Sequence, residues 1–250
     1  MKYLVGILFA GLLATGAARA DMNTVSQALA SPDRPDADKA MDAKRRPGEV
    51  LEFFGIDKPG MSVFDIFAGG GYYSEILSRI VGDDGIVTLY NNQPWDKFVA
   101  KDVEKRLADH RLPNVDRYIA APEELIDLPD QYDAAIFVLG MHDIYYTDDE
   151  NGWTTIDKQK FLKGIYNLVK PGGVLGVVDH DARPGSDPAV SGLKLHRIDP
   201  AVIIKDLESV GFKLEAQSDI LKNPNDNFDM TVFDPSVRRN TDRSVLRFRK

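Results

Sequence analysis

Three histidines in this 250-residue chain are the side chains best suited to proton-transfer chemistry. His142 follows the apolar run 134–139, where a buried strand is expected to end. His180 follows the run 174–179 in the same way, and His196 lies just before the next expected helix. Neutral histidine can take the proton that a hydroxyl or amine loses when it accepts a transferred group. We therefore predict that His142, His180 and His196 are catalytic.

The same histidines admit a competing interpretation as metal ligands. With an aspartate such as Asp143, Asp179 or Asp181, they would offer the nitrogen and oxygen donors that zinc accepts. The sequence has no short ligand spacing such as His-x-x-x-His, and it has no cysteine. We therefore assign no metal ligands from the sequence and expect one of these aspartates to orient a histidine ring.

A second candidate site is the glycine turn Gly69–Gly71. The apolar run 63–67 before it predicts a buried strand, which Asp65 interrupts. Apolar residues at helical spacing follow the turn, at Tyr73, Ile76, Leu77 and Ile80. The free N–H groups of a helix N-terminus favour anionic or polar ligands, and glycine allows a ligand to approach the backbone closely. We predict a ligand at this turn, with Tyr72 beside it because Tyr72 lies off the apolar face.

Strand and helix patterns alternate over most of the chain. Alternating strand and helix units are typical of a parallel sheet with helices on both faces. The predicted fold is therefore a doubly wound α/β domain with a mostly parallel seven-stranded sheet. Its expected strands lie near residues 63–67, 85–90, 118–120, 134–139, 174–179, 212–218 and 244–249.

The N-terminal 20 residues are typical of a signal peptide. Lys2 precedes an apolar stretch too short to span a bilayer, and Ala18-Arg19-Ala20 has small residues at the positions that a signal peptidase reads. We expect cleavage after Ala20, a periplasmic or secreted product, and no stable membrane anchor after cleavage. The polar stretch 21–48 is expected to form an N-terminal arm or helical cap, and residues 49–250 the main domain.

Composition limits the possible partners. The formal net charge is −8, which argues against a nucleic-acid backbone as the partner. The absence of cysteine excludes disulfides and thiolate metal sites. A small-molecule substrate is the remaining expectation, and the sequence leaves the oligomeric state open.

Several motifs carry a resemblance to a known family. The segment 63–72, Val-Phe-Asp-Ile-Phe-Ala-Gly-Gly-Gly-Tyr, resembles the first motif of class I S-adenosylmethionine-dependent methyltransferases. Segments 131–136 and 168–179 resemble the start of the fourth strand and the loop into the fifth strand of that family. The resemblance begins near Glu49 and runs to the C-terminus. It implies a Rossmann-like methyltransferase fold with S-adenosylmethionine as the cofactor.

Within that superfamily the chain is most similar to a group of predicted exported bacterial methyltransferases. Members of this group also carry Asp-His after the fifth strand, here Asp179-His180. They share Leu-His-Arg-Ile-Asp farther on, here residues 195–199.

The family motif implies roles for particular residues. Asp65, Gly69 and Gly71, with Gly70 between them, match positions that hold the methionine end of the cofactor. The first glycine of the family motif is replaced by Phe67.

Two further departures concern the adenosyl end. At the end of the second strand the family has an acid that binds both ribose hydroxyls, and this chain has Asn91, whose amide can also bond a hydroxyl. Where the family often has an aspartate for the adenine amino group, this chain has Ala121, and Glu123 is the expected substitute.

The resemblance implies methyl transfer from S-adenosylmethionine to an unidentified small molecule. Two alternatives stay open. One is an exported ligand-binding protein that kept the fold without the transfer. The other is a different enzyme, a hydrolase or a metal-dependent enzyme, that uses the cluster of His142, His180 and His196.

Overall fold

The computed structural model describes residues 24–250, so the predicted signal peptide lies outside the described residues. Its centre is one seven-stranded sheet with the strand order β3-β2-β1-β4-β5-β7-β6, in which only β7 runs antiparallel to its neighbours. The strands are β1 (Ser62–Ile66), β2 (Ile86–Asn91), β3 (Val115–Ile119), β4 (Tyr132–Val138), β5 (Val169–His180), β6 (Lys213–Ser218) and β7 (Arg243–Arg249). The predicted α/β fold and its seven strands are confirmed.

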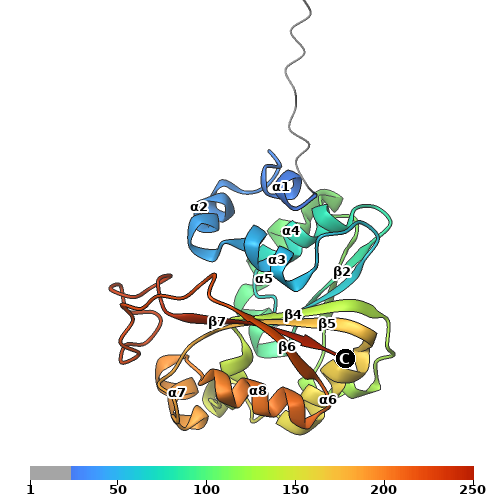
Figure 1. Ribbon diagram of the computed structural model, residues 1–250. Coiled ribbons are helices and arrows are strands. Elements are labelled where there is room, and N and C mark those ends of the chain that lie inside the picture. Colours follow the sequence, from blue (N-terminus) through green and yellow to red (C-terminus); the bar gives the residue numbers. More distant parts are fainter. Residues whose placement is uncertain (1–23) are drawn as a thin grey trace, which may run out of the picture.

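Helices cover both faces of this sheet (Figure 1). The α-helices are α1 (Thr24–Leu29), α2 (Asp36–Arg45), α3 (Pro47–Phe54), α4 (Tyr72–Val81), α5 (Gln93–Leu107), α6 (Lys158–Leu168), α7 (Pro188–Leu195) and α8 (Pro200–Ser209). Short 3₁₀ turns are η1 (Ala108–His110), η2 (Pro122–Asp127), η3 (Met141–Tyr145) and η4 (Asp149–Asn151). Among the described residues, no helix is long and apolar enough to cross a membrane.

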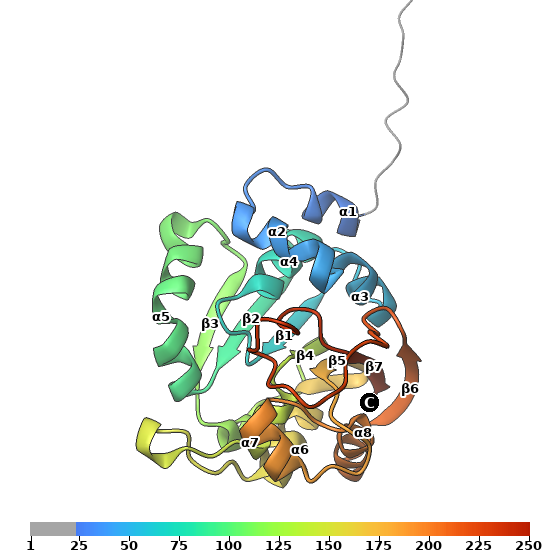
Figure 2. The same cartoon turned by 90° about the vertical axis from the view of Figure 1, so that its left-hand side faces the viewer.

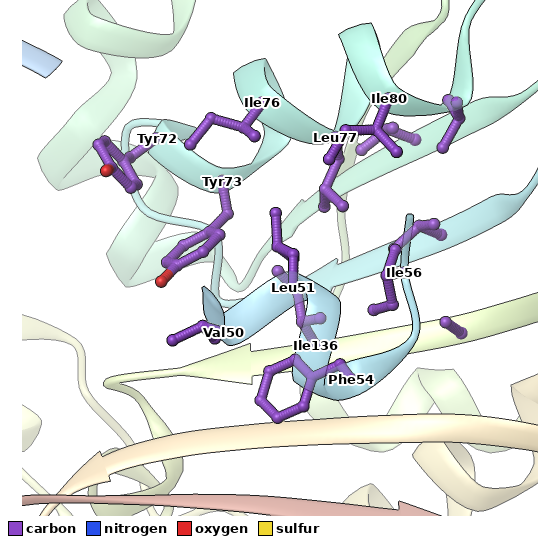
Figure 3. Packing of buried hydrophobic residues seen from close by; sticks show 14 of the residues in the cluster. Val50, Leu51, Phe54, Ile56, Tyr72, Tyr73, Ile76, Leu77, Ile80 and Ile136 are labelled. Carbon is purple, nitrogen blue, oxygen red and sulfur yellow. The ribbon is translucent and has the colours of Figure 1, made fainter. Parts of the chain in front are cut away.

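The side chains of β1 alternate between two cores. Val63 packs with the core under α1, α3, α4 and α5, whereas Phe64 and Ile66 pack with the core under α6 and α8. Figure 3 shows the first core, in which Leu51 of α3 lies between α4 and the pair formed by Phe54 and Ile136. Because successive strand residues face opposite sides, burial on both faces explains the near-continuous apolar run in the sequence.

Two short helices at the start of the described chain cap one end of the molecule (Figure 1). Val25 and Ala28 of α1 are buried in the same core as α4. The loop between α1 and α2 is held by Arg34, which is buried and forms a two-pronged ion pair with Asp42 of α2. The predicted boundary at residue 49 falls inside α3, and it stays a prediction.

A long connection between β6 and β7, residues 219–242, contains no helix or strand. Figure 2 shows it in front of β1, β4 and β5, between the N-terminal helices and α7. It is anchored by Asp226, which accepts two hydrogen bonds from the fully buried guanidinium of Arg197 at 2.8 and 3.1 Å. This connection therefore forms a fixed wall over the ends of the central strands.

Candidate functional site

A cleft of about 960 Å³ lies beyond the C-terminal ends of the parallel strands. It runs from the glycine loop after β1 to the three histidines that follow β4, β5 and α7. The other walls come from α2, α5 and the 219–242 connection. Open parallel sheets bind ligands at this edge, because the loops there converge. The cleft brings both candidate sites from the sequence into one space.

The backbone of the glycine loop is open to this cleft at Gly69 and is packed against other residues at Gly71. Gly69 has φ +56°, and a Cβ added there would find no atom within 4 Å. Gly71 has φ +79°, and its Cβ would lie 2.8 Å from Leu89 Cδ1 and 2.9 Å from Arg106 Cδ. Gly69 therefore leaves open space for a ligand, whereas Gly71 is required by packing and lies outside the cleft lining. Gly70 lines the cleft between them.

Phe67 adopts the backbone conformation that the missing glycine would have provided. Its φ is +47°, in the left-handed region that disfavours side chains. The ring is 5% exposed and stacks on Tyr90 and Phe161 at centroid distances of 5.7 and 5.4 Å. Burial of the ring offsets the backbone strain, and Phe67 still contributes to the cleft lining.

Asn91 holds the glycine loop from the other side. Its Oδ1 accepts from the Gly69 N–H at 2.9 Å, and its Nδ2 donates to the Gly69 carbonyl at 3.0 Å. The residue is fully buried and lies outside the cleft lining. In this conformation Asn91 shapes the loop and presents no surface to a ribose, so the predicted direct contact has no support in the geometry.

Asp65 is also a buried support of the loop rather than part of the cleft wall. Its Oδ2 accepts from Ser74 Oγ of α4 at 2.6 Å, and the residue is 2% exposed. Burial raises the pKa of Asp65 to about 7, and the hydrogen bonds from Ser74 oppose this rise only in part. Asp65 therefore fixes α4 relative to β1 and lies outside the cleft lining, and its predicted role at a cofactor stays a prediction.

Tyr72 lines the cleft as predicted, but its hydroxyl is already engaged. It donates to Asp42 Oδ1 of α2 at 2.6 Å, and the Arg45 guanidinium lies 4.5 Å from the ring centroid. Arg45 is half-buried and also lines the cleft. The helical cap thus places a cation beside the glycine loop, where it could meet an anionic group of a ligand.

The three predicted catalytic histidines do converge. The ring of His142 lies 6.1 Å from that of His180 and 5.4 Å from that of His196, centroid to centroid. His142 and His180 are buried, whereas the side chain of His196 is 23% exposed. His142 lies in η3 after β4, His180 ends β5, and His196 caps α7 with φ +53°. The exposed His110 lies in η1, outside the cleft lining.

Asp179 orients His142. Its Oδ1 lies 2.7 Å from His142 Nδ1, and its Oδ2 accepts from the His142 backbone N–H at 2.9 Å. An ionised carboxylate only accepts, so Nδ1 carries a proton and Nε2 points to Asp143, whose Oδ1 is 3.2 Å away. Burial lowers the pKa of His142, but Asp179 and Asp143 more than offset this and raise it to about 9.

His180 has the opposite electrostatic setting. Burial lowers its pKa well below the usual value, and the positive charge of His142 lowers it further. Its Nδ1 lies 2.6 Å from Thr241 Oγ1. Asp181, an alternative partner in the sequence, instead pairs with Lys222 Nζ at 2.6 Å. The cluster therefore holds one histidine that favours the charged form and one that favours the neutral form.

A side pocket of about 300 Å³ adjoins the cleft and shares Phe67, Asp143 and Tyr146 with it. Glu123 and Ala121 line this pocket, as does Gln93 at the start of α5. Glu123 Oε1 accepts from the Asp157 backbone N–H at 2.7 Å. The position of Glu123 fits its predicted contact with an adenine, and that contact stays a prediction.

Among the cleft residues that sequence reasoning did not single out, Arg106 and Trp153 make the contacts that matter most here. Arg106 of α5 donates from Nη1 to Asp38 at 2.8 Å and to Glu75 at 2.7 Å, and its Nε donates to the Gly70 carbonyl. Trp153 joins the cleft and the side pocket. Arg106 lies on a helix that reads as an ordinary surface helix, and Trp153 lies in a loop, so neither has a local signal.

The strand order, the single antiparallel strand and the glycine loop after β1 define the Rossmann-like fold of class I S-adenosylmethionine-dependent methyltransferases. No protein-family model matches the chain. Among solved structures, an S-adenosylmethionine-dependent methyltransferase from Aquifex aeolicus is similar with a TM-score of 0.57 at 20% identity. That match covers 86% of this chain and 98% of the Aquifex chain.

Curated relatives point to the same superfamily. The chain is 29% identical over 138 residues to the ubiquinone/menaquinone biosynthesis C-methyltransferase UbiE of Legionella pneumophila (strain Paris), covering 55% of this chain and 48% of that protein. It is 30% identical over 174 residues to UbiE of Proteus mirabilis (strain HI4320), covering 67% and 62%. These matches span only part of the relatives. They support the predicted superfamily and its cofactor, S-adenosylmethionine.

Proposed function

We propose that this protein transfers a methyl group from S-adenosylmethionine to a small aromatic molecule. The observation that carries the proposal is the continuity of the cleft, which joins the open backbone of Gly69 to the cluster of His142, His180 and His196. A donor bound at the loop and an acceptor bound at the histidines would therefore meet in one space. Methyl transfer depends mainly on such positioning, because it is an in-line displacement.

The residues present fit the cofactor at its methionine end. Open space over Gly69 would admit the cofactor backbone, and Arg45 is placed to receive its carboxylate. Bound S-adenosylmethionine supplies an electrophilic methyl group on a sulfonium. Glu123 and Gln93 are among the polar residues that line the side pocket and could bind the adenosyl end.

The acceptor end of the cleft is rich in aromatic side chains. Tyr146 and Phe233 contact the His196 ring at centroid distances of 5.5 and 4.7 Å, and Trp153 contacts Tyr146 at 5.8 Å. Such a wall favours a flat aromatic acceptor through stacking. Two relatives are named for quinone biosynthesis, which supports the same class of acceptor. A histidine of the cluster takes the proton when the acceptor atom must lose one.

Calorimetric titration with S-adenosylmethionine and with S-adenosylhomocysteine tests the donor site. Micromolar binding, worth about 8 kcal/mol, is expected. The variant Gly69→Ala should weaken it at least tenfold by filling the open space. Gly55→Ala is the matched control, because Gly55 also has φ +75° and open surroundings but lies at the end of α3. Absence of binding at millimolar cofactor would refute the proposal, as would equal loss in both variants.

A further inference from the structure

The histidine cluster contains a group of donor atoms with the composition of a metal site. His142, Asp143 and His196 each offer one ligand atom, and all three atoms lie within 4.8 Å of one another. Asp143 Oδ1 is 3.2 Å from His142 Nε2 and 3.8 Å from His196 Nδ1. Two ligands bound tetrahedrally at about 2.1 Å from one ion stand about 3.4 Å apart, so both distances are close to those of a metal-bound set.

A second observation points to a missing partner at this position. Asp143 Oδ2 is buried and has no hydrogen-bond donor among the described residues, and Asp143 as a whole is only 6% exposed. A buried carboxylate oxygen is costly unless a donor or a cation satisfies it. The other oxygen, Oδ1, lies 3.2 Å from His142 Nε2. The unpaired Oδ2 of Asp143 can therefore accept a cation.

The support behind His142 is also the one found in metal sites. A metal-binding histidine usually donates its other ring N–H to a carboxylate, which fixes the tautomer and the ring orientation. Asp179 does this for His142 Nδ1 at 2.7 Å and is itself fully buried. Asp179 also accepts from the backbone N–H groups of His142 and His180, so its own position is fixed.

We propose that His142 Nε2, the Asp143 carboxylate and His196 Nδ1 bind a divalent first-row transition-metal ion. The absence of sulfur and the two imidazoles favour zinc or a similar ion over calcium or magnesium. Three protein ligands leave a coordination position open, as in catalytic metal sites. All three ligands line the cleft, so the open position is accessible to a ligand bound there. His180 is not a ligand, because its Nδ1 is engaged with Thr241 and it lies outside the donor set.

The open position would bind an oxygen of the acceptor and polarise it. This role rests on the proposed methyl transfer, whereas metal binding itself does not. In the transfer the acceptor atom forms the bond to the methyl carbon, the carbon–sulfur bond breaks with its electron pair going to sulfur, and the acceptor proton leaves to a base.

Zinc titration of the chelator-treated protein tests the site by calorimetry, with Co²⁺ as a second probe whose visible spectrum reports the coordination. One ion per chain is expected. His196→Asn should weaken zinc binding at least tenfold, and asparagine tolerates the left-handed backbone at this position. Asp143→Asn should do the same with little change in shape. His110→Ala, which removes a histidine outside the cleft, should bind zinc as the wild type does.

Asp179 positions the His142 ring and does not bind the ion itself. Asp179→Asn should therefore weaken zinc binding by about 10- to 100-fold. Failure of the wild type to bind zinc, or zinc binding by folded His196→Asn equal to that of His110→Ala, would overturn the proposal. The cofactor titration is separate: zinc binding without cofactor binding would keep the metal site and refute methyl transfer. Cofactor binding without zinc binding would refute the metal site and leave the proposed methyl transfer standing.

Discussion

Replacing Asp65 by asparagine should make the protein less sensitive to alkaline pH. Asp65 is 2% exposed, and burial raises its pKa from 3.8 to about 7. A raised carboxyl pKa means that the folded state holds the proton more tightly than the unfolded state. The contribution to stability is therefore complete below pH 3.8 and is lost as the pH rises through about 7.

The size of the effect follows from the shift. Each unit of pKa corresponds to about 1.4 kcal/mol, so the approximately two units between pH 5 and the folded pKa amount to roughly 3 kcal/mol. Asparagine can keep the hydrogen bond from Ser74 and does not ionise. The stability of Asp65→Asn relative to the wild type should therefore rise by roughly 3 kcal/mol between pH 5 and pH 8.

Urea unfolding at the two pH values, followed by the fluorescence of Trp95 and Trp153, measures this difference. Asp133→Asn serves as a control, because the pKa of Asp133 is shifted in the opposite direction to that of Asp65. Burial would raise the pKa of Asp133, but hydrogen bonds from Lys170 and Ser62 outweigh it and lower the pKa. The stability of Asp133→Asn relative to the wild type should therefore stay constant between pH 5 and pH 8 and should rise only as the pH falls below 3.8. If the unfolding free energies of Asp65→Asn and the wild type changed with pH in parallel, the raised pKa of Asp65 would be refuted.

Two further substitutions test how the cleft is held together. Gly71→Ala should lower the free energy of unfolding by about 1–3 kcal/mol more than Gly55→Ala does, because both variants carry backbone strain but only Gly71→Ala also overpacks its surroundings. Urea unfolding of both variants measures the difference. Arg197→Met should cost about 3–5 kcal/mol by leaving Asp226 buried and unpaired. Arg183→Met breaks an exposed ion pair and should change stability by about 1 kcal/mol or less, so equal thermal shifts in the two arginine variants would contradict the anchoring role.

The approximate positions of the strands along the chain could be predicted because each strand has a local signal, whereas their order in the sheet has no such signal. β1, β4 and β5 are apolar on both faces, and a glycine turn follows β1. The strand expected at 174–179 begins earlier, at Val169, so the Lys-Pro-Gly-Gly segment 170–173 lies inside β5 and not before it. The convergence of the histidines follows from the same pattern, because the carboxyl ends of parallel strands share one edge. Their mutual distances could not be predicted, since they depend on how η3 and α7 pack together.

The role of Asn91 shows the limit of reading a motif position by position. The residue does end the second strand, as predicted. Its amide, however, closes two hydrogen bonds with Gly69, and only the three-dimensional path of the loop reveals this. Arg45 and Arg46 stand just before α3 in the sequence, where they could reach an anion, but only the packing of α2 shows that Arg45 lines the cleft.

The departures from the glycine motif are physically coupled. Phe67 accepts a left-handed backbone that costs roughly 1–2 kcal/mol, and burial of its ring returns roughly 1.5–3 kcal/mol. Asn91 then fixes the next turn of the loop through Gly69. The packed Phe67 ring and the two hydrogen bonds of the Asn91 amide therefore fix the conformation of the glycine loop without a ligand. Such preorganisation lowers the cost of binding. Because the Asn91 amide is engaged with Gly69, we expect polar residues of the side pocket, Gln93 and Glu123 among them, to supply the contacts of a ribose.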